Sequence, residues 1–375
     1  MDLDDLTPES LLEQGLQALR DQLGPTWDVS LQPSPREARS GRQHLDALVQ
    51  VKSDGDSVFT QLLVDLRKNV TPRMVEEQLL PKLDLVRQVN SYTSPMVIAP
   101  WIAPRVQLLL RENGIGYIDL TGNMSLRVPR PAIVLYTQGE TRSPLAGSPR
   151  STKATLAGPK VGRLVRLLAD VFPPYRAAQL AEAAKLSLPY VSRLLDTLED
   201  QLLIRRQGRV IKDVDWPQLL RVRAEQLNLL RHNPYVGMVA PNGIDAVLRA
   251  LRTLPEADRH SVAVTGSYAA HSVAPLAVGG QLMLYVTAGP HTPDIIGEDL
   301  GLLRVDKGAD VLMLRAHDSV VFERTVEMDG LPRVALSQLV LDCLSGPGRM
   351  PAEGEAVLTY MQENPQLWRA AQLPI

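Results

Sequence analysis

Hydrophobic residues in the first third of the chain follow the helical period of 3.6 residues in some segments and the strand period of two in others. Leu12, Leu16 and Leu19, for example, fall on one helical face. The predicted elements, in chain order, are a helix around Leu11–Leu19, strands at Leu45–Lys52 and Val58–Leu66, a helix at Met74–Val89, a strand at Pro95–Ala99, a helix at Ala103–Asn113, and strands at Tyr117–Leu120 and Ser125–Val128. Helices and strands in this order predict a mixed three-layer α/β domain.

The middle of the chain shows three short helical patterns in succession, at Val161–Val171, at Arg176–Ala184, and from Ser187 to about Gln201. Lys185-Leu186-Ser187 forms a tight connection before the third pattern, with Ser187 as a suitable N-cap. The apolar face of the third helix consists of Val191, Leu194, Leu195 and Leu198. The polar face opposite carries Tyr190, Ser192, Arg193 and Thr197.

Two short strands follow the third helix and are joined through Gln207-Gly208. This hairpin carries Arg205, Arg206, Arg209 and Lys212. Three helices, a tight turn before the third and a basic hairpin predict a winged helix-turn-helix, with these eight polar and basic residues as DNA contacts. The third helix of such a unit can enter the major groove, which is about 12 Å wide, while cations on the hairpin contact phosphates.

The distribution of charge along the chain supports DNA binding by this region more strongly than the net charge of the whole chain does. The chain has 40 Lys and Arg against 42 Asp and Glu, a net charge of -2. Between Thr141 and Lys212 there are 13 basic and 5 acidic residues, a net charge of +8, so the remaining 27 basic and 37 acidic residues give -10. A basic centre between acidic flanks is typical of a region that binds a polyanion.

Length and composition limit the class of protein. A chain of 375 residues with 45% apolar residues predicts two or three globular domains. Cys343 is the only cysteine, which excludes an intrachain disulfide and a thiolate metal cluster. Met1–Ser10 has no apolar run, and apolar stretches elsewhere are far shorter than the roughly 18 residues of a membrane span. We therefore expect a cytoplasmic protein without a cofactor.

Residues 138–159 are rich in Gly, Ser, Pro and Thr, lack a hydrophobic period, and predict a linker. A weaker boundary falls near Asn233-Pro234. The predicted division is an α/β domain at 1–137, the linker, the winged helix-turn-helix at 160–232, and a second α/β domain at 233–375.

Asp46 lies in one predicted strand of the first domain, and Asp65 and Arg67 lie on one face of the next. This arrangement resembles the PD-(D/E)XK restriction-endonuclease family, in which strand-borne carboxylates and a lysine position a divalent metal and water. The lysine of the family is here Arg67, a planar, permanently charged group. We therefore expect a vestigial site, without metal or catalysis, in which Asp65 and Arg67 form a salt bridge.

The last domain contains a strand at Ser261–Thr265 followed by Gly266-Ser267, which resembles the phosphate-binding turn of the nucleotidyltransferase fold. Such enzymes also need an Asp-x-Asp pair to hold metal, and the next predicted strand, Leu282–Val286, is wholly apolar. Further strands at Val311–Leu314 and Val320–Arg324 and a helix at Val334–Leu344 predict an α/β domain without visible catalytic residues.

The order of parts resembles the AbiEi family of bacterial antitoxin-like transcriptional regulators. The resemblance depends on residues 117–123 (YIDLTGN), residues 264–270 (VTGSYAA), and the two stretches ALSQ and GPGR at 335–338 and 346–349. It implies operator binding through the winged helix and, as in some members, neutralisation of a protein toxin. Members usually carry the winged helix at the amino terminus, whereas here it is central.

These observations predict a non-enzymatic, sequence-specific regulator that binds double-stranded DNA, as a homodimer because palindromic operators match two-fold proteins. Three alternatives remain open. They are a Mg²⁺-dependent nuclease of the PD-(D/E)XK type, an antitoxin that binds a protein toxin, and a solvated three-helix unit that contacts protein instead of DNA.

Overall fold

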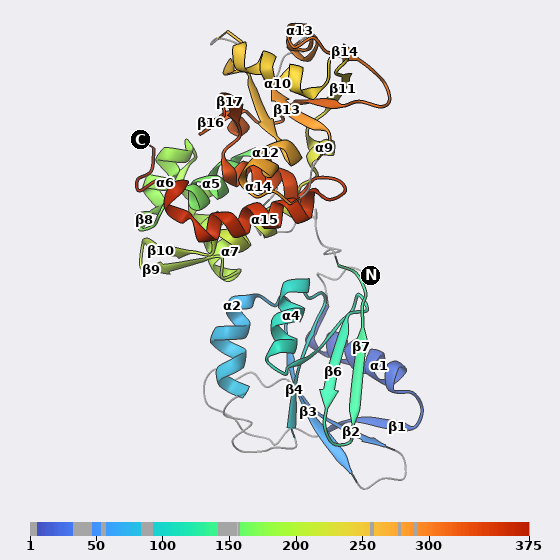
Figure 1. The fold of residues 1–375 in the computed structure, drawn as a ribbon. Coiled ribbons are helices and arrows are strands. Elements are labelled where there is room, and N and C mark those ends of the chain that lie inside the picture. The colour runs from blue at the N-terminus through green and yellow to red at the C-terminus, as the bar shows by residue number, and fades with distance from the viewer. Residues whose placement is uncertain are drawn as a thin grey trace. The chain divides into compact units, whose positions relative to one another are not determined.

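In the computed structural model, the described residues are 6–32, 47–53, 58–83, 93–141, 156, 158–255, 259–276, 279–287 and 292–374. The chain forms two compact units, residues 1–153 with 200–202, and residues 154–199 with 203–375 (Figure 1). The described part contains three sheets and helices beside them, which confirms a mixed α/β class. Residues 158–232, called the middle segment below, and the C-terminal segment thus belong to one compact unit, although the sequence suggests a boundary near residue 233.

The first unit is built on one seven-stranded sheet whose strands follow one another in chain order. The strands are β1 (Trp27–Gln32), β2 (Ala47–Ser53), β3 (Phe59–Leu66), β4 (Thr93–Ala99), β5 (Gly116–Asp119), β6 (Met124–Val128) and β7 (Ile133–Thr137). The central pairs β3–β4 and β4–β5 are parallel, and the remaining pairs are antiparallel. A parallel pair needs a crossover, and helices occupy both crossovers.

Helices cover both faces of this sheet (Figure 1). They are α1 (Pro8–Leu23), α2 (Pro72–Met74) with the π-helical turn η2 (Val75–Leu79), and α4 (Pro104–Glu112). Met96 and Ile98 of β4 pack on the side of α1, whereas Val97 packs on the side of α4. Because a strand's side chains alternate between faces, a strand buried on both sides shows a continuous apolar run. The predicted helix at Met74–Val89 begins earlier, at Pro72, and is described only to residue 83.

The middle segment begins with three helices and a small three-stranded sheet. Its elements are α5 (Pro159–Asp170), β8 (Tyr175–Arg176), α6 (Ala177–Ala184), α7 (Leu188–Asp200), β9 (Ile204–Gln207) and β10 (Val210–Val214). The strands lie in the order β8-β10-β9, all antiparallel. Two further helices follow, α8 (Trp216–Ala224) and α9 (Leu229–His232). This is the helix and hairpin order that the sequence predicts.

The C-terminal segment contains a second seven-stranded sheet in the order β14-β11-β15-β13-β12-β17-β16. The strands are β11 (Tyr235–Val239), β12 (Val262–Thr265), β13 (Leu282–Val286), β14 (Leu303–Arg304), β15 (Val311–Arg315), β16 (Val326–Met328) and β17 (Leu331–Arg333). The helices are α10 (Ile244–Thr253), α12 (Gly266–Val273), α13 (Thr292–Asp299), the 3-10 helix η3 (Ser319–Phe322), α14 (Leu336–Leu344), α15 (Met350–Glu363) and the 3-10 helix η4 (Pro365–Leu367).

A single hydrophobic core runs through both segments of the second unit. It includes Leu168 of α5, Leu195 of α7, Leu220 of α8 and Leu341 of α14, each at most 3% exposed. Because burial of apolar surface contributes roughly 25 cal/mol per Å², separating the two segments would expose part of this core to water at a cost in free energy. The middle segment therefore packs against the C-terminal segment as part of one folded unit.

The side chain of Arg166 in α5 is fully buried within this unit. Its guanidinium donates to the carbonyl of Val320, to the carbonyl of Glu323 at 2.7 Å, and to Ser337 Oγ at 3.4 Å. A buried cation needs several acceptors to offset the loss of water. The prediction of a strand at Val320–Arg324 is wrong, because the structure has the 3-10 helix η3 there. The Val320 and Glu323 carbonyls accept hydrogen bonds from Arg166. Asp318 Oδ1 accepts from the Val320 amide at 3.1 Å, which stabilises η3.

Residues 369–370 near the C-terminal end of the chain also contact the middle segment, at the end of α5. Ala370 forms a parallel bridge with Val171, directly after α5. Arg369 donates to the carbonyls of Ala169 and Val171, both at 2.8 Å, and its guanidinium lies 4.4 Å from the ring centroid of Phe172. No helix within the described ranges combines the length and apolar character that a membrane crossing requires.

Candidate nucleic-acid interface

The local sequence of α7 determines which of its faces is exposed. Its four predicted apolar positions, Val191, Leu194, Leu195 and Leu198, are all fully buried. Lys185 ends α6 in the left-handed region at φ 53°, and the Val191 amide donates to the Ser187 carbonyl at 3.1 Å, which makes Ser187 the residue before the first turn. The three-residue connection predicted between these helices is therefore present.

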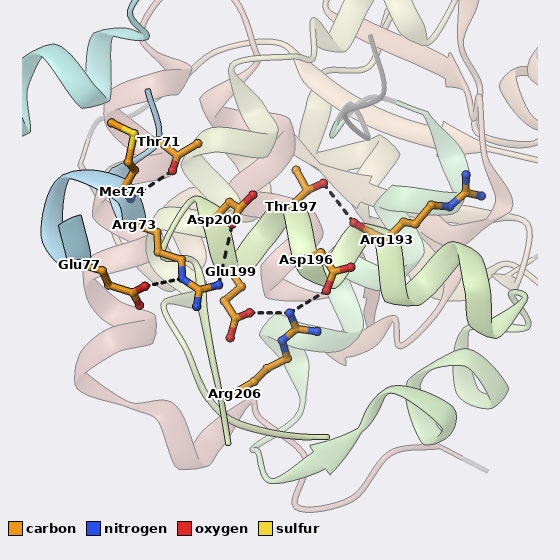
Figure 2. Close-up of polar contacts among 10 residues, drawn as sticks. All are labelled: Thr71, Arg73, Met74, Glu77, Arg193, Asp196, Thr197, Glu199, Asp200 and Arg206. Atoms are coloured by element: carbon orange, nitrogen blue, oxygen red, sulfur yellow. Dashed lines mark hydrogen bonds and ion pairs between the residues drawn. The ribbon is translucent and has the colours of Figure 1, made fainter. Parts of the chain in front are cut away.

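The polar face of α7 is less uniform than the sequence suggests. Arg193 is exposed, Ser192 and Thr197 are half-buried, and the Thr197 hydroxyl donates to the Arg193 carbonyl at 3.1 Å (Figure 2). Tyr190 is half-buried and packs against the hydrophobic core. Arg193 is thus the predicted residue of this helix that extends furthest into solvent.

The hairpin of β9 and β10 turns through Gly208 and Arg209, one residue later than the predicted Gln207-Gly208, because Gln207 is still in β9 and pairs with Val210. Gly208 has φ 60°, a backbone conformation that glycine adopts without strain. Arg205, Arg209 and Lys212 are all exposed. These three side chains supply the free positive charge of the hairpin.

Arg206 has a different environment from the other three cations. Its Nη2 lies 2.7 Å from Asp196 Oδ1 and 2.5 Å from Glu199 Oε2, both in the last turns of α7 (Figure 2). The hydrogen bond to Glu199 is the main cause that raises the pKa of Arg206. Period 2 places Arg206 on the same strand face as the buried Ile204. Arg206 therefore ties the hairpin to the carboxyl end of α7.

These contacts leave the two ends of α7 with opposite character. Its first turn contains no acidic residue, and the helix dipole adds partial positive charge at that end. Lys185, exposed in the preceding turn, adds another cation that the sequence reasoning did not single out, although it stands within the predicted connection. The acidic residues lie at the far end, where Arg206 offsets two of them. An anion is best accommodated at the amino-terminal half of α7.

Of the predicted vestigial nuclease residues, Asp65 lies in β3 of the first unit and Arg67 directly follows that strand. Arg67 donates through Nε to Asp65 Oδ1 and through Nη2 to Asp65 Oδ2 at 3.0 Å, so the guanidinium covers both carboxylate oxygens. Lys82 Nζ lies 3.7 Å from Asp65 Oδ2. Asp46 lies outside the described residues. The salt bridge expected between Asp65 and Arg67 is present, and within the ranges that the structure describes no group of three His, Cys, Asp or Glu residues could hold a metal ion.

Neither models of known protein families, nor curated proteins, nor solved structures give a match to this chain. The resemblances to endonuclease-like, nucleotidyltransferase-like and AbiEi-type proteins thus stay predictions.

Proposed function

We propose that this protein is a sequence-specific, double-stranded DNA-binding regulator of transcription that uses α7 and the β9–β10 hairpin. The observation that carries the proposal is the arrangement of α7, whose apolar face is fully buried while Arg193 on the opposite face is exposed. With 13 residues, α7 is about 20 Å long, and a helix of that size fits the major groove.

The roles of the basic residues differ in this proposal. Arg193 reads base edges, because it extends from the amino-terminal half of α7, the end that usually meets the bases. Arg205, Arg209 and Lys212 contact phosphates, which supply affinity without sequence information. Arg206 holds the hairpin in place through Asp196 and Glu199 and contacts DNA only indirectly.

The first experiment is selection of bound sequences from a random library of duplex DNA, followed by titration of the full chain against the selected sequence. We expect Arg193→Ala to weaken specific binding by about 1–3 kcal/mol, which is roughly 5- to 150-fold, and to relax preference at one base position. Arg249→Ala is the matched control, because Arg249 is an exposed arginine on α10, outside the winged helix-turn-helix. Equal losses in the two variants would contradict the assignment of Arg193.

The hairpin is tested by the dependence of affinity on salt. Arg209→Ala is expected to weaken binding to all sequences alike and to reduce the slope of log affinity against log salt by about 0.9 for each lost phosphate contact. Arg206→Ala is expected to destabilise the hairpin instead. If no sequence is enriched and the affinity for duplex DNA does not depend on salt, the proposed function is wrong.

A further inference from the structure

A cavity of about 320 Å³ that is partly open to solvent lies in the second unit, between the winged helix-turn-helix and the C-terminal segment. Its walls include Gly158, Gly162 and Arg166 from α5 and its N-cap, Arg223 of α8, Asp318 before η3, and Asp342 of α14. A volume of this size falls at the lower end of the range for small-molecule sites, which is roughly 300–1,000 Å³.

Arg223 is the charged residue in the cavity wall with buried donor atoms that lack an acceptor in the described part of the chain. Its side chain is 6% exposed, and its Nη2 donates to the Gly158 carbonyl at 3.0 Å. Nε and Nη1 are shielded from solvent and have no hydrogen-bond partner among the described residues. Burial lowers the pKa of Arg223 to about 10, so the group stays cationic at neutral pH. A buried, incompletely bonded cation costs free energy unless an acceptor reaches it.

The Arg223 guanidinium can approach α5 closely because residue 162 is a glycine without a side chain. A Cβ at residue 162 would lie 3.1 Å from Arg223 Nη2, closer than ordinary van der Waals contact. Glycine inside a helix costs roughly 0.5–1 kcal/mol relative to alanine. Gly162 therefore lowers the stability of α5 at the position where Arg223 approaches the helix.

The acidic residues of the same cavity are already hydrogen-bonded within the protein. Asp342 accepts from Tyr285 and Gln338, at 2.9 and 2.8 Å, and Asp318 Oδ1 accepts from the Val320 amide at 3.1 Å. Asp318 raises the pKa of Arg223 by electrostatic attraction, but among the described residues no hydrogen bond joins a carboxylate to Nε or Nη1 of Arg223. These two donors are therefore available to an anion in the cavity.

We propose that this cavity binds a small organic acid, whose carboxylate or phosphate group is the missing partner of Arg223. The acid contacts α5 of the winged helix-turn-helix on one side and the C-terminal segment on the other. Binding of the acid to the folded state stabilises the second unit by linkage. The test requires no DNA, so its failure and the failure of the proposed function are distinguishable.

The experiment measures unfolding of the full chain by tryptophan emission. Trp27→Phe and Trp101→Phe remove the tryptophans of the first unit, and Trp216 and Trp368, whose rings are 4.8 Å apart, then report on the second. Sodium acetate, sodium phosphate and sodium chloride are compared at equal ionic strength. We expect acetate or phosphate to raise the unfolding midpoint above its value in chloride, and the arm that responds identifies the acid as carboxylate or phosphate.

The response should disappear in Arg223→Gln and persist in Arg221→Gln, the matched control. Arg221 lies on the same helix and pairs at the surface with Glu355 at 2.7 Å. Gly162→Ala keeps the positive charge of Arg223 but displaces its guanidinium, so we expect a smaller rise of the unfolding midpoint in acetate or phosphate. This variant tests the proposal if Arg223→Gln does not fold. The proposal is overturned if neither acid raises the midpoint of the parent protein, or if the full response survives in Arg223→Gln or Gly162→Ala.

Discussion

Asp342 makes the stability of the second unit depend on pH in a direction that the structure specifies. This carboxylate on α14 is 3% exposed and accepts hydrogen bonds from Thr265 at 2.6 Å, from Gln338 at 2.8 Å and from Tyr285 at 2.9 Å. Burial raises its pKa from 3.8 to about 6, because the loss of water disfavours the charged form more than the hydrogen bonds favour it.

The sign and size of the effect follow from linkage. Since the folded pKa lies above the unfolded one, the folded state binds the proton more tightly. The contribution of Asp342 to stability is therefore fully present below the unfolded pKa and is lost as the pH rises through about 6. A shift of about two pKa units, at 1.36 kcal/mol per unit, corresponds to about 3 kcal/mol.

The assay is urea denaturation of the full chain carrying Trp27→Phe and Trp101→Phe, with and without Asp342→Asn, at several values between about pH 4 and about pH 7. We expect the free energy of unfolding of the parent, relative to the Asn variant, to fall by about 2.5 kcal/mol across this range, because part of the effect of about 3 kcal/mol lies below about pH 4. Asp299→Asn, at an exposed carboxylate of α13 in the same unit, is the control. Parallel curves for the parent and Asp342→Asn, or a difference that grows with pH, would refute the reasoning.

Three further predictions concern buried charges and catalysis. Asp170→Asn should destabilise the second unit by about 3–5 kcal/mol, because Asp170 lies 2.6 Å from Arg324 and 4.0 Å from Arg166; a loss below about 1 kcal/mol in urea denaturation, the value typical of surface pairs, would contradict this. Asp119→Ala should destabilise the first unit by about 2–6 kcal/mol, since it leaves at least two buried backbone amides without an acceptor, and an unchanged thermal midpoint would show that water replaces the carboxylate. Plasmid incubated with Mg²⁺ should stay uncut, because Arg67 covers both oxygens of Asp65; nicking that Asp65→Ala abolishes would overturn the non-enzymatic prediction.

The sequence alone determined those features that depend on neighbours within a few residues. The buried face of α7, the turn that begins at Lys185 and the hairpin around Gly208 all follow the prediction. The helical period of apolar residues predicts the buried face of α7, and local backbone preferences predict the two turns. The buried run of β4 was likewise visible, because a strand covered on both faces has no polar side.

The tertiary structure decided which charges are available. Arg205 and Arg206 are adjacent and chemically identical, yet the packing of the hairpin against α7 exposes one and pairs the other with Asp196 and Glu199. Arg166 counts toward the basic middle of the chain, but it is fully buried among carbonyl groups more than 150 residues away in sequence. Hydrophobic period contains no information about such distant acceptors, so a cation's partner, and with it the cavity beside Arg223, becomes visible only when the whole unit is folded.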